Sequence, residues 1–114
     1  MSFFDDIVIG EPVEIGTHLF TAEEIVRFAR AFDPQPFHLD AEAAKASLFG
    51  GLCASGWHTT AVFMKLNVAF MAATAARRAA EGLDEPQWGP SPGVRNIKWL
   101  RPVYAGDRIT YRTT

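Results

Sequence analysis

The stretch SGWHTTAVFMKLNVAFMAATAARRAAEG, residues 55–82, decides the fold. Ser55 is a preferred N-cap residue, two arginines fall in the last turns, and Gly82 is typical of the position that follows a helix. These signals predict one helix from Gly56 toward Glu81, spanning roughly 38 Å at ~1.5 Å per residue. Apolar residues occupy nearly every side of this helix, so it needs cover on nearly every side.

This apolar helix is expected to lie inside a protein and not in a membrane. A membrane span requires about 20 predominantly apolar residues, and three polar residues interrupt the run: His58, Lys65 and Asn67. Neighbouring segments can supply the cover, since strand patterns occur at 13–20, 94–100 and 108–114, with a YAGD turn at 104–107. We therefore predict an α+β fold in which a curved antiparallel sheet wraps around a long central helix.

Shorter helices are predicted before the central one. The TAEE sequence at 21–24 is a capping box with Thr21 as its N-cap, and the helix it opens is stopped by Pro34. Asp40 then caps a short alanine-rich helix. We predict a single domain over residues 1–114. Because the sequence stops inside a predicted strand, it is compatible both with a whole domain and with a domain truncated at its C-terminal end.

Composition and charge narrow the class of protein. The 114 residues are 48% apolar and 21% charged, with a net charge of −2. These values are typical of one globular domain and give no reason to expect nucleic-acid binding. The single cysteine, Cys53, excludes an internal disulfide and a cysteine-based metal cluster, and we expect it to be a small buried residue. The first residues do not resemble a signal peptide, so a cytoplasmic location is predicted.

The stretch AFDPQPFHLD, residues 31–40, combines an acid and a histidine with two prolines. Asp33 and His38 are side chains that exchange protons near neutral pH when their surroundings adjust their pKa values. Pro34 and Pro36 restrict the backbone between them. In an extended chain ~15 Å would separate Asp33 from His38, so a shared function requires the loop to curl back. The structural alternative is an Asp that ends a helix and a His that packs under a loop.

Three motifs together resemble the MaoC-like dehydratases, relatives of the (R)-specific enoyl-CoA hydratases, which have the hot-dog fold. The motifs are FDPQPFHLD at 32–40, LFGGLCASGWHT at 48–59 and SPGVRNIKWLRPVYAGDRI at 91–109. The resemblance implies that Asp33 and His38 form a catalytic dyad and that the backbone N–H of Gly56 binds the thioester oxygen. It also implies hydration of trans-2-enoyl thioesters to (R)-3-hydroxyacyl thioesters, or the reverse dehydration.

The sequence departs from the family pattern Gly-Asp-x-Asn-Pro-hydrophobic-His, with Phe32 for the glycine and Gln35 for the asparagine. Ser55 replaces the histidine that precedes the oxyanion glycine. As the N-cap, Ser55 can accept a hydrogen bond from the first turn and leave the Gly56 N–H free. That N–H points outward with the positive end of the helix dipole behind it. The departures keep the dyad intact and leave the acyl substrate open.

Other residues are assigned with less specific signals. We assign substrate binding to Ser55, Trp57, Arg95 and Lys98. Three cations, Arg95, Lys98 and Arg101, suit the phosphates of CoA or of an acyl-carrier protein, with a solvated strand face as an at least equal alternative. His58 is expected to be buried with its polar atoms satisfied. Three aromatic residues are expected to line either the core or an acyl tunnel: Phe63, Phe70 and Trp99.

The sequence thus predicts a hydro-lyase that acts on CoA or acyl-carrier thioesters by acid–base catalysis, without a metal or redox cofactor. A homodimer or higher homo-oligomer is expected, because a lone sheet leaves an edge to be covered. One alternative is a hot-dog thioesterase, which usually needs a carboxylate in the central-helix region, yet residues 56–80 contain no Asp or Glu. The other alternative is a non-catalytic acyl-thioester-binding module, and the intact Asp33–His38 pair argues against it. No nucleic-acid or membrane partner is expected.

Overall fold

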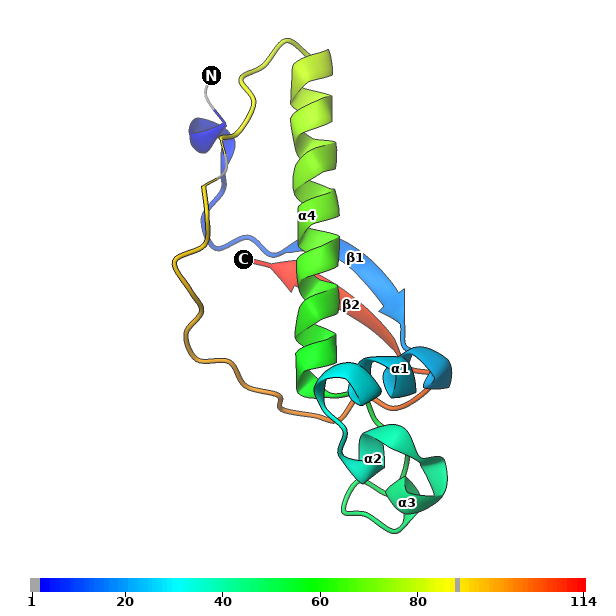
Figure 1. The fold of residues 1–114 in the computed structure, drawn as a ribbon. Helices are drawn as coiled ribbons and strands as arrows, with labels where there is room; N and C mark the ends of the chain where they lie inside the picture. Colours follow the sequence, from blue (N-terminus) through cyan, green and yellow to red (C-terminus); the bar gives the residue numbers. More distant parts are fainter. Residues whose placement is uncertain (1–2, 88) are drawn as a thin grey trace.

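The computed structural model describes residues 3–87 and 89–114 (Figure 1). In chain order its elements are η1 (Phe4–Asp6), β1 (Val13–Leu19), α1 (Ala22–Phe32), α2 (Pro36–Leu39), α3 (Ala41–Lys45), α4 (Gly56–Ala80) and β2 (Arg108–Thr113). The helices α1, α2 and α3 gather at the end of the molecule where α4 begins (Figure 1). The predicted α+β class and the long central helix are therefore confirmed.

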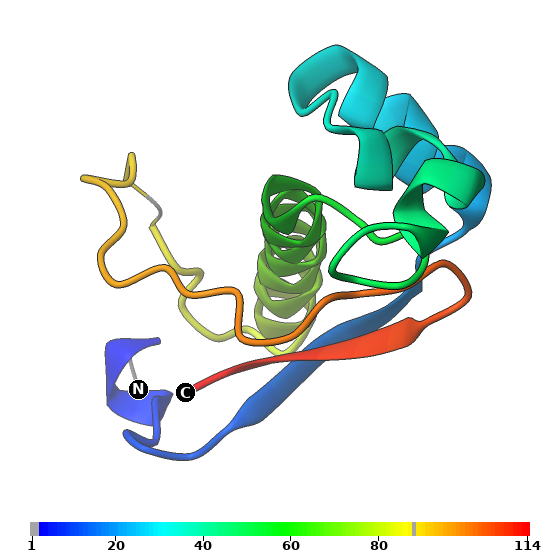
Figure 2. The same ribbon diagram turned by 90° about the horizontal axis from the view of Figure 1, so that it is seen from below.

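The sheet pairs β1 with β2 in antiparallel orientation, with Leu19 opposite Arg108. Figure 2 shows this ribbon lying along one side of α4. A bulge interrupts the register beside Gly16, and bulges bend a strand locally. A Cβ atom at Gly16 would lie only 3.1 Å from Cδ2 of Leu66 in α4. The missing side chain therefore lets the strand approach the central helix closely.

The core lies where the sheet, α1 and the first half of α4 meet. Its buried side chains are Phe20, Ile25, Ala54 and Val62, and half-buried side chains of β2 pack against them. Burial of a side chain such as Phe or Ile stabilises a fold by about 1.5–3 kcal/mol. Because this core sits beside the first turns of α4, it fixes the start of that helix relative to α1 and α2.

The helix boundaries near the site follow the predicted caps. Thr21 Oγ1 accepts a hydrogen bond from Glu24 N at 3.2 Å, and α1 ends two residues before Pro34. Asp40 Oδ1 accepts a hydrogen bond from Glu42 N at 2.9 Å at the start of α3. Each cap satisfies an N–H group that has no partner within its own helix.

The predicted cover of α4 is incomplete. Two strands lie about 4.8 Å apart, whereas a helix with its side chains is roughly 10 Å wide, so this ribbon covers one face only. Met64 and Val68 remain 50% and 51% exposed. By length and composition alone, α4 is long and apolar enough to cross a membrane, and most of its apolar stretch is not buried. Within the described residues, α4 is therefore covered on one side, and much of its remaining apolar surface is exposed.

Residues 94–100, which lie within the described part of the chain, form no strand, so that prediction was wrong. A strand pattern produces a strand only where another strand offers hydrogen-bond partners, and β1 and β2 pair with each other. Asn96 also has a positive φ of 58°, which departs from extended geometry. The segment runs past the start of α4 and brings Trp99 against it.

Candidate active site

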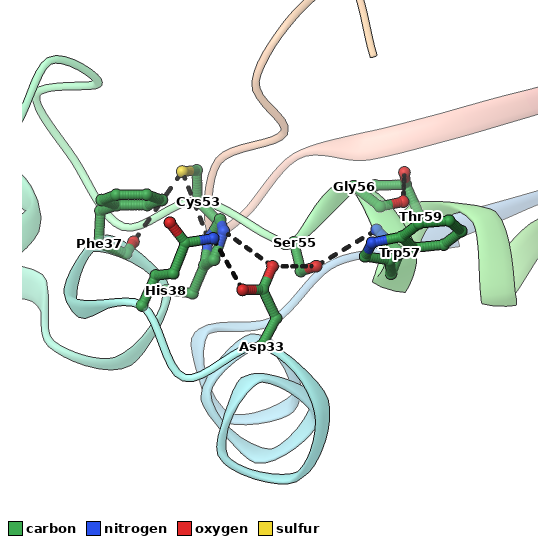
Figure 3. Close-up of polar contacts among 9 residues, drawn as sticks. Asp33, Phe37, His38, Cys53, Ser55, Gly56, Trp57 and Thr59 are labelled. Atoms are coloured by element: carbon green, nitrogen blue, oxygen red, sulfur yellow. Dashed lines mark hydrogen bonds and ion pairs between the residues drawn. The ribbon is translucent and has the colours of Figure 1, made fainter. Parts of the chain in front are cut away.

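Asp33 and His38 lie side by side. Asp33 is the C-cap residue of α1, and His38 belongs to α2, a single turn that begins with Pro36. His38 Nε2 lies 3.5 Å from Asp33 Oδ2 (Figure 3). The loop between them therefore curls back as a shared function requires. The carboxylate and the imidazole face the same space.

The His38 ring is held by the backbone of Cys53. Nδ1 of His38 lies 2.6 Å from the Cys53 carbonyl oxygen, and since a carbonyl only accepts, Nδ1 donates. Nε2 is therefore the ring nitrogen that faces Asp33. Burial raises the pKa of the Cys53 thiol, and this side chain is 1% exposed. Cys53 is thus a buried residue, as expected, and its Sγ lies 3.8 Å from His38 Nδ1.

Ser55 connects the acid to the central helix. Its Oγ donates to Asp33 Oδ2 at 2.7 Å and accepts from Trp57 N at 3.2 Å, and Gln35 Nε2 donates to Asp33 Oδ1 at 2.8 Å. Burial raises the pKa of Asp33, but these two side-chain hydrogen bonds and the nearby His38 outweigh it and hold the pKa below its usual value. Asp33 is therefore a carboxylate at neutral pH, able to accept a proton.

Gly56 is the first residue of α4. Its N–H points away from the helix, where no preceding turn supplies an acceptor, and the Ser55 hydroxyl is occupied by the N–H of Trp57. The dipole of a 25-residue helix adds positive potential at this point. The arrangement suits a carbonyl oxygen on which negative charge develops.

A cavity of about 770 Å³ joins these groups. Its walls include Asp33, Gln35, Phe37, His38, Phe49, Gly56, Trp57, Lys98, Trp99, Arg101, Ile109 and Tyr111. Aromatic rings form much of the wall, and polar and charged side chains converge on the same space, which is typical of a small-molecule site. The size is within the range of about 300–1,000 Å³ found for ligand pockets.

The structure brings together six of the seven residues assigned from the sequence. Five of them line the cavity: Asp33, His38, Gly56, Trp57 and Lys98. The sixth, Ser55, is hydrogen-bonded to Asp33. Arg95 does not line this cavity and is exposed. Because 94–100 is not a strand, the alternation that would have placed it with Lys98 does not apply.

Gln35 and Trp99 line the site but were not among the seven residues assigned to it from the sequence. Gln35 had been noted only as a departure from the family's asparagine, although its position two residues after Asp33 is within reach of a side-chain hydrogen bond. Trp99 was assigned only to a core or a tunnel. Its contact with Gly56 depends on the path of residues 94–103, for which the sequence offered a strand pattern and no other signal.

His58 forms a second polar cluster on the side of α4 that faces α1. Its ring stacks on Phe28 at a centroid distance of 4.7 Å, and its Nε2 lies 3.9 Å from Glu24 Oε1, which also binds His18 Nε2 at 2.5 Å. Within the described residues, His58 Nδ1 is buried without a hydrogen-bond partner. The expectation of a buried His58 is confirmed, while the expected satisfaction of its polar atoms was wrong for Nδ1.

We expect His58 to make folding stability fall in mild acid. Burial lowers the pKa of His58, against the opposing effect of Glu24, so the folded protein binds a proton less readily than the unfolded chain. The contribution is complete above the unfolded pKa near 6.5 and is lost as pH falls below it. Urea unfolding at pH 7.5 and 5.5 measures this loss. His58→Phe, which keeps a ring beside Phe28, should lose less stability over that interval, and an equal loss would contradict the assignment.

Comparison with known proteins agrees with this architecture. An α+β fold with a long central helix, an antiparallel sheet against it and a site at the helix start is that of the hot-dog proteins. The profile described as "MaoC like domain" matches residues 6–114. The chain therefore belongs to the MaoC-like domain family. The family and fold implied by the sequence motifs are confirmed.

Solved structures and curated relatives resemble the chain over most of its length. The MaoC-like dehydratase from Rhodospirillum rubrum superposes with a TM-score of 0.68 at 36% identity, covering 95% of this chain and 66% of that one. R-hydratase PhaJ1 from Pseudomonas aeruginosa has a TM-score of 0.53 at 24% identity, covering 96% and 61%, and shows the fold alone. The uncharacterized protein YdeM of Bacillus subtilis is 29% identical, covering 92% and 67%. The chain thus spans about two thirds of the length of these relatives.

Proposed function

We propose that the protein hydrates trans-2-enoyl thioesters to (R)-3-hydroxyacyl thioesters, or catalyses the reverse dehydration. The observation that carries the proposal is the approach of Asp33 Oδ2 and His38 Nε2 to 3.5 Å in a cavity that also contains Gly56. Membership of a hydratase and dehydratase family supports the same reaction class. Acid, base and oxyanion donor are the three groups that addition of water to a conjugated thioester requires.

In this mechanism the Asp33 carboxylate takes a proton from a water molecule as its oxygen bonds to C3 of the substrate. His38, protonated on Nε2, gives a proton to C2. The negative charge that develops on the thioester oxygen is held by the Gly56 N–H and the dipole of α4. Transfer of the proton from Asp33 to His38, its neighbour at 3.5 Å, restores both groups. One water is consumed, with OH added at C3 and H at C2.

The two alternative functions have weaker support. A thioesterase would direct water at the thioester carbonyl, and within α4 there is no acidic residue to activate it. A binding module would not need Ser55 and Gln35 to hold the Asp33 pKa low beside a histidine. Perturbed titratable groups that converge in one cavity favour a catalytic site.

The proposal includes the carrier of the acyl group, which is CoA or an acyl-carrier protein, and the oligomeric state of the protein. Lys98 and Arg101 at the cavity can meet the phosphates of CoA or of an acyl-carrier protein. We expect no metal or redox cofactor, because acid–base groups suffice for the step. The outer edges of the sheet, which have no neighbouring strand among the described residues, support a homo-oligomer. Sedimentation velocity tests this, and a monomer at micromolar concentration would contradict it.

The test of the proposed reaction is turnover of trans-2-butenoyl-CoA by the purified protein. We expect loss of the absorbance of the conjugated thioester and, on chiral analysis, the (R) alcohol. Release of free CoA with the double bond intact would instead identify a thioesterase. Binding without turnover across several acyl chain lengths would identify a binding module.

A further inference from the structure

The indole of Trp99 lies directly against Gly56. A Cβ atom at residue 56 would be 2.3 Å, 2.5 Å and 2.7 Å from Cδ2, Cε2 and Cγ of Trp99, so the ring packs on the glycine α-carbon. Trp99 Nε1 donates to Thr60 Oγ1 at 3.2 Å. The ring of Trp57 meets Trp99 edge-on, with centroids 5.0 Å apart. Trp99 is therefore fixed to the first turns of α4 by three separate contacts.

These contacts make Trp99 the wall of the cavity beside the oxyanion donor. On the sheet side, Tyr111 OH donates to Thr59 O at 2.8 Å and closes the space between β2 and α4. Met64 follows Thr60 by one turn on the same helix face and is half exposed. The half-exposed indole thus lines the cavity and is hydrogen-bonded to Thr60, and Met64 continues the same face of α4 one turn further on.

We propose that Trp99 is a specificity-determining residue that restricts this site to short-chain enoyl thioesters. The inference rests on the proposed function, because it takes the Gly56 N–H as the donor to the thioester oxygen. A substrate held there has its acyl group next to the indole, and a long alkyl tail would meet that ring. Without the ring, the tail would gain contact with the α4 surface around Met64. The carrier, with its amides and phosphates, would gain nothing from that surface.

The test compares kcat/KM for trans-2-butenoyl-CoA and trans-2-decenoyl-CoA. We expect the wild type to prefer the butenoyl substrate and Trp99→Ala to raise the decenoyl-to-butenoyl ratio at least tenfold. Each buried methylene contributes about fourfold, so contact with two or three suffices. Trp99→Phe keeps a smaller ring in place and should shift the ratio less. Val94→Ala, on the same segment and 72% exposed, should leave the ratio unchanged.

Two outcomes would overturn the inference while hydration itself remained. They are a wild type that already prefers the decenoyl substrate, and an equal change of kcat/KM for both substrates in Trp99→Ala. If that variant fails to fold, Thr60→Val removes the anchor of the indole and should raise the same ratio to a smaller extent. Calorimetric binding of butanoyl-CoA and decanoyl-CoA gives a readout independent of turnover, in which the ratio of Kd values should move the same way. Absence of hydration with an unchanged Kd ratio would refute both proposals.

Discussion

Asp33→Asn is expected to lower kcat for enoyl-thioester hydration by about 10²-fold or more. An amide cannot take the proton from water, although it has the shape of the carboxylate and can still hydrogen-bond with Ser55 and Gln35. The fold should therefore survive, with an unfolding midpoint close to that of the wild type. Loss of kcat with little change in KM would mark a group that acts in the transition state.

Asp40→Asn is the matched control for this variant. It makes the same chemical change seven residues away, at an exposed N-cap outside the cavity, where Asn caps a helix about as well as Asp. We expect unchanged kinetics. Because Asp33 and His38 act as a unit in the proposed mechanism, adding His38→Gln to Asp33→Asn should lower kcat little further. A multiplied loss in the double variant would mean that the two residues act independently.

The helix boundaries and part of the candidate site could be predicted because the sequence signals for them are local. The caps at Thr21, Asp40 and Ser55 are set by side chains that bond N–H groups two or three residues away, so the sequence shows both partners. The Asp33–His38 pair was predictable because only four residues, two of them prolines, lie between the two side chains. Family motifs then placed Gly56 in the same site.

The features of the fold and the site that the sequence did not predict depend on contacts between residues distant in the sequence. Residues 94–100 have the pattern of a strand, yet β1 and β2 pair with each other, and the pattern could not reveal this. The bond from Ser55 to Asp33 spans 22 residues, and the anchor of His38 is the backbone carbonyl of Cys53, which every residue type possesses. Local patterns are silent on such contacts, since tertiary packing decides them.

The position of Trp99 could be predicted only in part. Its residue type suggested a core or tunnel position. Its contact with Gly56 depends on the path of residues 94–100, which form no strand, and the sequence pattern did not predict that path. A glycine whose α-carbon is covered by an indole is required for packing as well as for access of a substrate carbonyl. The two requirements can be separated by experiment at residue 56.

Gly56→Ala is expected to lower kcat/KM by about 10²-fold, comparable to the loss of an oxyanion-hole donor. The new methyl group would lie 2.3 Å from the Trp99 ring, which no real Cβ contact tolerates, so the indole must leave Thr60. Overpacking of this kind costs roughly 1–3 kcal/mol of stability. Kinetics with trans-2-butenoyl-CoA and urea unfolding measure the two effects.

The double variant Gly56→Ala/Trp99→Ala distinguishes packing from catalysis. With the indole removed, the methyl group meets no ring, so the stability lost through overpacking should return relative to Trp99→Ala alone. Activity should stay low, because the methyl group still stands beside the N–H where the thioester oxygen has to approach. Recovery of activity together with stability would show that Gly56 serves only to accommodate Trp99. In that case the thioester oxygen would need another donor, and the assignment of the α4 N-terminus as the oxyanion site would be wrong.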